Sequence, residues 1–354
     1  APWFDRYTTP LAIAAVLFTG IGPLLAWRRV SAGRALRLLG PPAAVAALST
    51  LLLTVATDAG SEPLALLMFC FGAFALTGLI GEFARGAAAQ RALSGGSRSA
   101  ALGQVVARNR RRYGGYIVHV GVVIAFAAVA ASSSFQESVD VRMRPGDSTT
   151  VGDYDITYER ATSQVVGSEQ RVTFGAVLAI SREGRDAGVL VPSRNYYAAP
   201  GADPTAGPLR AFFEEGQATS EIGRRAGASQ DLWTAAQPDL SVLGPVIARA
   251  DRELLRALPT DIDPSGPTPE QLEAMRAFPQ LQGDAIERLA AAYPGLAIPV
   301  DFRLNVNPFV IWIWIGGAIA VVGGLIAVWP APSARRRRVS DVYAARLARD
   351  LGRA

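Results

Sequence analysis

One residue of this chain stands out for the chemistry it could do, and that residue is its only histidine, His119. It follows the arginines Arg110 to Arg112 by about two helical turns and enters an apolar run that extends to Ala131. A titratable side chain in such a segment is costly, so it is a candidate for function. The imidazole could hydrogen-bond a neighbouring helix, relay protons or, when neutral, ligate haem iron. Hydrocarbon surroundings favour the neutral form.

Two neighbours of the histidine complete the candidate site. Gly115 lies four residues earlier, which places it on the same face of a helix, and Tyr116 is next to it. The missing side chain of Gly115 would let a flat ring approach the backbone. The pair Gly114-Gly115 could equally be a flexible start of the helix. If a cofactor binds, we expect His119, Gly115 and Tyr116 to contact it.

The composition excludes several other kinds of chemistry. Cys70 is the only cysteine, so the chain has neither a disulfide framework nor a cysteine-based metal cluster. No C-x-x-C-H sequence is present, so the chain is not itself a c-type cytochrome. All 35 basic residues are arginine, which excludes Schiff-base and other lysine chemistry. No phosphate loop, catalytic triad or pair of catalytic carboxylates can be recognised, and no catalytic residue is assigned.

The distribution of charge predicts a membrane protein with a large external insert. Half of the residues are hydrophobic, and they cluster in runs. Residues 133–306 hold 16 arginines against 24 acidic residues, a net charge of −8. The remainder has a net charge of +13, concentrated in short segments beside apolar runs. This is the positive-inside pattern of a membrane protein, and it does not indicate binding to nucleic acid.

Five membrane-spanning helices satisfy this pattern, with residues 133–306 outside and the C-terminus in the cytoplasm. The segment 85–114, with seven arginines and no acidic residue, is the strongest orientation signal. The chain begins with Ala1 rather than methionine, and we expect it to be part of a longer protein. The predicted spans are Leu11 to Trp27, about Pro42 to Thr57, Pro63 to about Phe83, the His119 helix, and Pro308 to Trp329.

The external region is predicted to be an α+β domain that is β-rich in its first half. Hydrophobic residues alternate around Val139–Met143, Tyr154–Tyr158, Val172–Ile180 and Val300–Val306, which is typical of strands in a small barrel or sandwich. Thr268 and Asp284 each precede a sequence typical of a helix start.

Three groups of residues outside the candidate site have structural interpretations. Arg108 and Arg110–Arg112 are interpreted as orientation anchors, and one of them could pair with an acidic headgroup or a haem propionate. Gly316, Ala320 and Gly324 are spaced by four residues and predict a small-residue face for close helix packing. Trp312 and Trp314 are expected at the outer membrane boundary.

Three segments together resemble CcmF-type proteins, the haem-lyase subunits of cytochrome c maturation. They are the stretch from Phe4 through Gly20-Ile21-Gly22-Pro23 to Trp27-Arg28-Arg29, the stretch from Arg110 through Tyr113-Gly114-Gly115-Tyr116 to His119 and Gly121, and Asn307-Pro308 followed by Trp312-Ile313-Trp314-Ile315-Gly316-Gly317. The middle segment, with its lone histidine, is the most specific. The resemblance covers nearly the whole chain but only the C-terminal half of such a protein.

The resemblance implies that His119 is one of two transmembrane histidines that ligate a resident haem b. It also implies that a haem chaperone delivers a second haem, which is attached through thioethers to a C-x-x-C-H apocytochrome c. Other cytochrome c maturation subunits and the inner-membrane lipid bilayer would be the remaining partners. The family's tryptophan-rich haem-handling motif and its second transmembrane histidine are absent from this chain. Residues from about Gly244 to Pro294 resemble an insertion in the family's external domain.

Two further functions are consistent with the same residues. The chain could be a non-enzymatic membrane scaffold whose external domain docks a partner, with His119 as a packing residue. It could also be a transporter subunit, although besides His119 only Glu82 approaches a membrane pathway. The predicted organisation is 1–132 with four spans, 133–306 as the external domain, 307–330 as the last span and 331–354 as a basic cytoplasmic tail.

Overall fold

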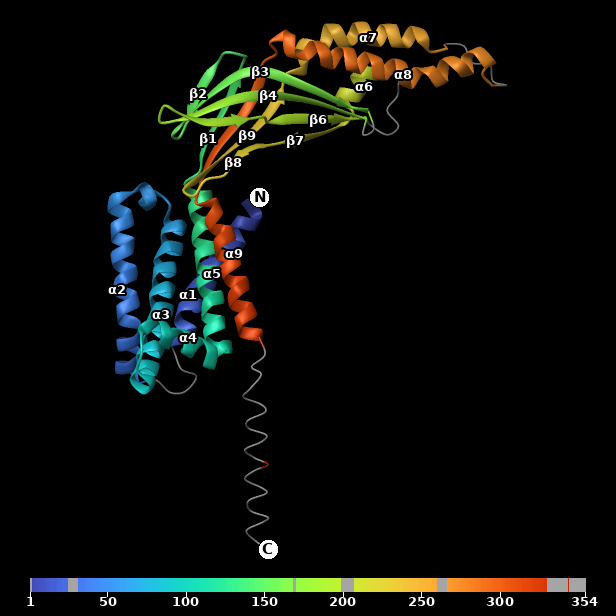
Figure 1. The fold of residues 1–354 in the computed structure, drawn as a ribbon. Helices are drawn as coiled ribbons and strands as arrows, with labels where there is room; N and C mark the ends of the chain where they lie inside the picture. The colour runs from blue at the N-terminus through green and yellow to red at the C-terminus, as the bar shows by residue number, and fades with distance from the viewer. Residues whose placement is uncertain are drawn as a thin grey trace. The chain divides into compact units, whose positions relative to one another are not determined.

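The computed structural model describes residues 2–24, 31–167, 170–198, 207–259, 266–329 and 343. They form two compact units, one from Ala1–Ser134 together with Phe309–Ala354 and the other from Phe135–Pro308. Trp27-Arg28-Arg29 and the basic tail, including Arg335–Arg338, fall outside the described residues, Tyr343 apart. Each unit is described by itself below (Figure 1).

The first unit is a helical bundle. Within the part of the chain that the structure describes, five helices have the length and hydropathy needed to cross a membrane, as predicted: α1, α2, α3, α5 and α9. The helices are α1 (Pro2–Leu24), α2 (Ala32–Ala56), the 3-10 helix η1 (Asp58–Ser61), α3 (Pro63–Ser94), α4 (Arg98–Arg108), α5 (Arg110–Ser134) and α9 (Val310–Val328).

The bundle differs from the prediction in four helix boundaries or elements. Helix α1 begins at Pro2, nine residues before the predicted start of the first span at Leu11. Helix α2 begins at Ala32 and continues through Pro41 and Pro42, where the sequence predicted its start. Helix α3 extends eleven residues beyond the predicted end at Phe83 and stops at Gly95, whose φ of 67° is a conformation that glycine adopts without strain. The basic segment after it contains α4, capped by the Ser97 side chain. The length of an apolar run predicts the membrane-spanning part of a helix but not how far the helix continues through polar residues. Hydropathy therefore could not predict these differences.

The described residues of the second unit form ten strands in two sheets. The four-stranded sheet has the order β1-β10-β9-β8, and the other has the order β2-β3-β4-β6-β7, with β5 also paired to β4. All pairings are antiparallel. The strands are β1 (Glu137–Met143), β2 (Ser148–Val151), β3 (Tyr154–Val166), β4 (Arg171–Arg182), β5 (Arg185–Leu190), β6 (Ser193–Tyr197), β7 (Gln217–Glu221), β8 (Gly223–Arg225), β9 (Gln230–Pro238) and β10 (Val300–Pro308).

The alternating hydrophobic residues of the sequence form the core of this unit, because successive side chains of a strand point to opposite faces. The alternating sets of β3, β4 and β10 are buried together. Its largest fully buried side chains include Tyr158, Phe174, Phe302 and Tyr293. The rings of Phe174 and Tyr293 stack with centroids 4.2 Å apart.

The two sheets are connected at both of their ends along the chain. Strands β7 and β8 are one extended segment that changes sheets at Ile222: β7 pairs with β6, and β8 pairs with β9. Strands β1 and β2 also belong to different sheets and are joined by a turn at Pro145-Gly146-Asp147. The fold is therefore intermediate between the barrel and the sandwich that the sequence predicted.

Two helices interrupt the sheet connection between β9 and β10. These strands pair directly, with Pro238 opposite Val300, yet α7 (Gly244–Ala257) and α8 (Pro269–Ala292) lie between them in sequence and side by side in Figure 1. Thr268 caps α8 as predicted, through a capping box with Gln271. The predicted helix start at Asp284 is wrong, since α8 runs through Pro279 and Asp284 without a break.

The short elements of the second unit are α6 (Pro208–Glu214), η4 (Leu240–Leu243) and η5 (Tyr293–Leu296). Helix α6 is tied to the helical pair by Asp251 of α7, whose carboxylate accepts hydrogen bonds from the backbone N–H groups of Leu209 (2.6 Å) and Arg210 (3.3 Å). The prediction of strands mainly in the first half of the domain is only partly right, because β9 and β10 flank the helical insertion.

Candidate functional site

Helix α5 is held against α9 by residues without large side chains. A Cβ atom on Gly121 would lie 2.4 Å from the carbonyl oxygen of Gly316 and 2.5 Å from the backbone nitrogen of Ala320. A Cβ on Gly114 would lie 2.7 Å from the nitrogen of Ala327. Real Cβ contacts are never this short, so glycine is required at both positions. The two helices lie side by side in Figure 1, with backbones in contact along one seam.

The predicted small-residue face of α9 is right in kind but wrong at one position. Gly316 and Ala320 face α5 as expected. The next residue of the seam is Gly323, where an added Cβ would lie 2.6 Å from the nitrogen of Val118, whereas a Cβ on Gly324 would meet no atom within 4 Å. Residues spaced by four drift slowly around a helix of 3.6 residues per turn. The step of three residues from Ala320 to Gly323 brings the contact back to the side that faces α5.

A second face of α5 packs against α3 through aromatic rings. The ring centroids of Tyr113 and Tyr116 lie 5.2 and 6.0 Å from that of Phe83. Leu79 is fully buried beneath them. This packing directs the Tyr116 ring toward α3, while Gly115 and His119 belong to another face of the helix.

His119 lies on the face of α5 between these two contacts. Phe126, seven residues on and on the same face, packs against a cluster that contains Ile13 and Val16 of α1. The Nδ1 atom of His119 is buried, and none of the described residues forms a hydrogen bond with it. A buried ring nitrogen without a partner is costly in a protein interior. The structure therefore does not show the hydrogen bond to a neighbouring helix that a purely structural histidine was expected to make.

Gly115 is open on the side it shares with His119. A Cβ atom built on Gly115 would meet nothing within 4 Å, in contrast to its neighbour Gly114. The two glycines thus have different roles: Gly114 lets α9 approach, and Gly115 leaves free space one turn from the imidazole.

Tyr116 and Arg112 form a polar network with Glu82 of α3. The Arg112 guanidinium donates to the Tyr116 hydroxyl (Nε to Oη, 2.7 Å) and to the carboxylate of Glu82 (Nη2 to Oε2, 2.5 Å). Glu82 also pairs with Arg85 at 2.7 Å. Its side chain is only 11% exposed, and it is the only acidic residue of α3. The sequence placed Glu82 near the membrane, but separation by thirty residues hid its pairing with Arg112.

The remaining candidates of the first unit lie apart from this network. Cys70 is half-buried in α3. Trp312 and Trp314 are 42% and 69% exposed in the first turn of α9. Among the described residues no group of three histidine, cysteine or acidic side chains is close enough to hold a metal ion.

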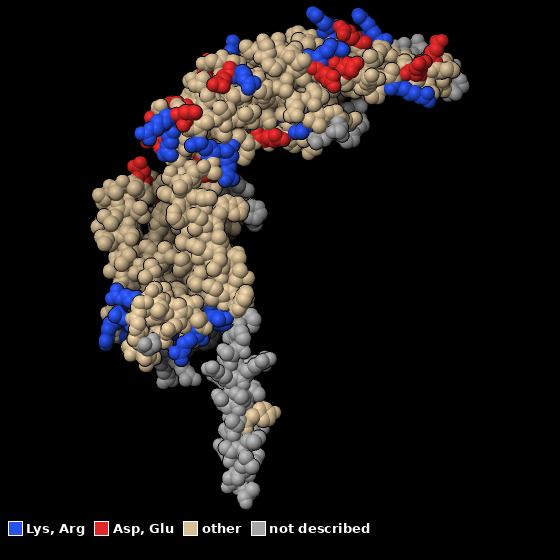
Figure 2. Space-filling view, viewed as in Figure 1, with Lys and Arg blue, Asp and Glu red and all other residues tan. Residues whose placement is uncertain are grey.

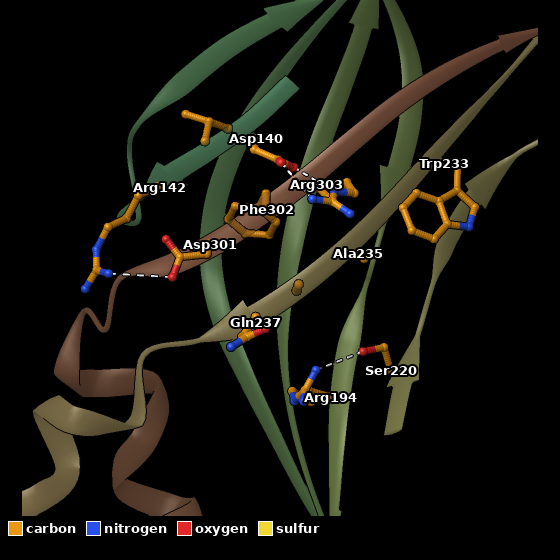
Figure 3. A pocket seen from close by; sticks show the side chains of 12 residues that line it. Asp140, Arg142, Arg194, Ser220, Trp233, Ala235, Gln237, Asp301, Phe302 and Arg303 are labelled. Atoms are coloured by element: carbon orange, nitrogen blue, oxygen red, sulfur yellow. Dashed lines mark hydrogen bonds and ion pairs between the residues drawn. The ribbon is translucent and has the colours of Figure 1, made fainter. Parts of the chain in front are cut away.

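The second unit carries a groove of its own, of about 660 Å³, over the four-stranded sheet (Figure 3). Trp233 of β9 and Arg194 of β6 line it, and Arg194 donates to Ser220 at 3.2 Å. On its other side Arg303 and Asp140 form a two-point pair, with both N–O distances 2.8 Å. This pair lowers the pKa of Asp140, mainly through the hydrogen bonds from Arg303. The groove combines the half-buried ring of Trp233 with three arginines and two aspartates.

The described part of the chain thus has five helices that are long and apolar enough to cross a membrane, and one large β-rich unit between the fourth and the fifth of them. No family model matches the chain. It is 24% identical over 336 residues to "Cytochrome c-type biogenesis protein CcmF" of Escherichia coli, which covers 95% of this chain and 38% of that protein. The same-named protein of Pseudomonas aeruginosa is 22% identical over 92% of this chain and 37% of its own length. "Cytochrome c-type biogenesis protein ccl1" of Rhodobacter capsulatus is 32% identical over 44% of this chain and 22% of its own length.

A solved structure agrees with these relatives. "Cytochrome c Heme Lyase CcmF" superposes with a TM-score of 0.55 at 20% identity and covers 93% of this chain and 41% of that one. The likeness shows the fold. The resemblance to CcmF-type proteins predicted from the sequence is thereby confirmed, and the chain spans about two fifths of the length of these relatives.

Proposed function

We propose that the chain is part of a membrane haem lyase that attaches haem to C-x-x-C-H apocytochrome c through thioether bonds. The carrying observation is the buried, unpartnered ring nitrogen of His119 on the helix that the sequence linked to this family. Similarity to CcmF proteins over nearly the whole chain supports the same function. The haem destined for apocytochrome c is a substrate in this scheme, distinct from a resident haem b.

The residues around His119 fit a resident haem b. The imidazole lies in apolar surroundings that favour its neutral, metal-binding form, and the free space at Gly115 would accept a flat ring. When bound, haem b supplies one-electron chemistry. In this proposal His119 provides one axial ligand, and the second comes from residues outside this chain.

Tyr116 remains in the proposed site in a positioning role. Its hydroxyl accepts from Arg112, and Arg112 is held by Glu82, so the first two turns of α5 are tied to α3. This tie would fix the rotation of α5 about its axis and hence the direction in which His119 points.

We further propose that the bundle lies in the inner membrane with the domain 135–308 on the extracytoplasmic side and the C-terminus in the cytoplasm. The positive-inside rule supports this orientation, because the arginines of 85–112 lie at one end of the bundle. Figure 2 shows arginine side chains gathered at that end and a surface without charged side chains above them. The partners in this scheme are apocytochrome c, a haem chaperone, other maturation subunits and the bilayer.

A docking scaffold is the second candidate function, and the groove beside Trp233 supports it. Tryptophan and arginine side chains are enriched among the residues that contribute most to protein–protein binding, and the groove holds Trp233 together with three arginines. In that case His119 would be a packing residue, and the intact complex would carry no b-type haem that depends on it.

The two functions are separated by replacing His119 in the intact membrane complex. We expect His119→Ala to abolish the resident b-type absorption and to lower covalent haem attachment to a co-expressed apocytochrome c by at least tenfold. Ile124→Ala is the matched control, because Ile124 lies about 140° around the same helix. It should retain both. Unchanged haem content in His119→Ala, at normal protein levels, would favour the scaffold.

A further inference from the structure

A basic cavity of about 500 Å³ lies at the arginine end of the helical unit, between the corner of α4 and α5 and the last turn of α9. Arg108, Arg110, Arg111 and Arg112 line one side, and Ala327–Trp329 line the other. None of the described residues that line it is acidic. The cavity belongs to the same unit as His119 but lies about two turns away, at the end of the helix.

Arginines far outnumber acidic residues in the segment that forms this end of the unit. The segment from Arg85 to Gly114 contains no acidic residue, and Glu82 shares its single carboxylate between Arg85 and Arg112. Arg110 to Arg112 also form the first turn of α5, where the helix dipole disfavours cations and favours an anion. Three arginines in that turn oppose the dipole, so a bound anion would stabilise the helix start.

The surroundings of the cavity indicate that this anion carries hydrocarbon. Val321, Leu325 and Val328 recur at helical spacing on α9 and are 63%, 55% and 77% exposed, so an apolar stripe leads along the helix to the cavity. Trp329 ends the stripe and is 64% exposed, as tryptophan at a membrane–water boundary commonly is. A soluble anion would make no contact with the apolar stripe.

We propose that this cavity binds the phosphate headgroup of an anionic phospholipid whose acyl chains lie along the Val321–Leu325–Val328 stripe. Guanidinium groups bind phosphate oxygens in a two-point geometry, and basic pockets between membrane helices suit such headgroups. The proposal depends on the bundle lying in a membrane and is independent of haem binding at His119.

The experiment compares phosphatidylglycerol with phosphatidylcholine in mixed micelles of the purified full chain, with bound lipid counted by native mass spectrometry. We expect a preference for phosphatidylglycerol that the double variant Arg108→Gln/Arg111→Gln weakens by about 25-fold, or about fivefold for each arginine removed. Arg98→Gln is the matched control. It removes an exposed arginine of α4 outside the cavity and should leave the preference unchanged.

Four results would overturn the proposal. The first is an unaltered preference in the double variant, and the second is an equal loss in Arg98→Gln, which would indicate diffuse charge attraction. The third is displacement of the lipid by millimolar inorganic phosphate, which would make this a site for the free ion. The fourth is loss of b-type haem from the intact membrane complex that carries the double variant, while the purified variant chain still binds the lipid, which would assign the arginines to a haem propionate. The absorption spectrum of the intact complex with Arg98→Gln tests the His119 proposal separately. If that complex contains no b-type haem, the His119 proposal fails whatever the lipid measurements show.

Discussion

At the scale of single residues, the candidate site combines one buried polar atom that has no hydrogen-bond partner among the described residues with three polar side chains that bond to one another. The Nδ1 atom of His119 is buried without a hydrogen bond among the described residues, whereas the nearby Arg112, Tyr116 and Glu82 satisfy one another. Tyr116 and His119, three residues apart on α5, therefore differ in whether their polar atoms are paired. The polar network ties α5 to α3. In the proposed function, the unpartnered nitrogen of His119 is the group that would bind iron.

Two core tyrosines of the β-rich unit predict a pH dependence of stability. Burial raises the pKa of Tyr158 to about 12, because the phenolate would lose its hydration, and it also raises the pKa of Tyr293. A raised pKa in the folded state means that the stabilisation is complete below the unfolded value near 10 and is lost as the pH rises through 12. The Tyr158 hydroxyl has no partner among the described residues.

We therefore expect Tyr158→Phe to leave stability at pH 8 unchanged within about 1 kcal/mol and to flatten its decline above pH 10. A single such tyrosine contributes about 1.4 kcal/mol for each pH unit in that window. Thermal unfolding followed by circular dichroism at pH 8 and pH 11 measures both effects. Tyr197→Phe, at a half-exposed position of β6, serves as control. An equal decline in the Tyr158 variant and the wild type would contradict this explanation.

At the scale of elements, the placement of His119 depends on the α5–α9 seam. Four glycines make it possible, since an added Cβ on any of Gly114, Gly121, Gly316 or Gly323 would approach backbone atoms within 3 Å. The sequence predicted a small-residue face on α9 but could not predict which of the small residues contact α5. Which of Gly323 and Gly324 faces the partner depends on a local step of three or four residues, and both steps preserve hydrophobicity.

Adjacent glycines of α9 provide a matched test of the seam. Gly323→Ala is expected to lower the free energy of unfolding by about 1 to 3 kcal/mol, because the methyl group must separate the helices. Gly324→Ala meets open space and should be neutral or stabilising by up to about 1 kcal/mol through helix propensity. Thermal unfolding in detergent distinguishes the two. Equal effects would show that Gly323 is not in the contact.

At the scale of the whole molecule, the sequence predicted five spans, an inserted β-rich domain and a single histidine-bearing helix, because each produces a local periodicity. It did not predict α4, the pairing of Glu82 with Arg112, or the crossing of one strand between two sheets at Ile222. These depend on residues that are distant in sequence or on a bend that leaves the alternation of side chains intact. Hydrophobic pattern alone therefore cannot specify them.

The proposed membrane orientation predicts which residues are accessible from outside. With Cys70 replaced by alanine, a membrane-impermeant maleimide should label Ser220→Cys in intact cells or sealed right-side-out vesicles. It should label Ser97→Cys only after the membrane is broken. Both positions are exposed in the structure, so accessibility reports sidedness rather than burial. Labelling of Ser97→Cys first would invert the proposed topology.

The central claim, that the imidazole of His119 ligates iron, is tested most directly by exchanging the ligand rather than deleting it. In purified membranes, His119→Met should retain b-type haem but change its reduced-state absorption and raise its reduction potential, because methionine as an axial ligand favours the reduced iron. A potentiometric titration followed by visible absorption measures both quantities. A variant with the wild-type spectrum and potential would contradict the account.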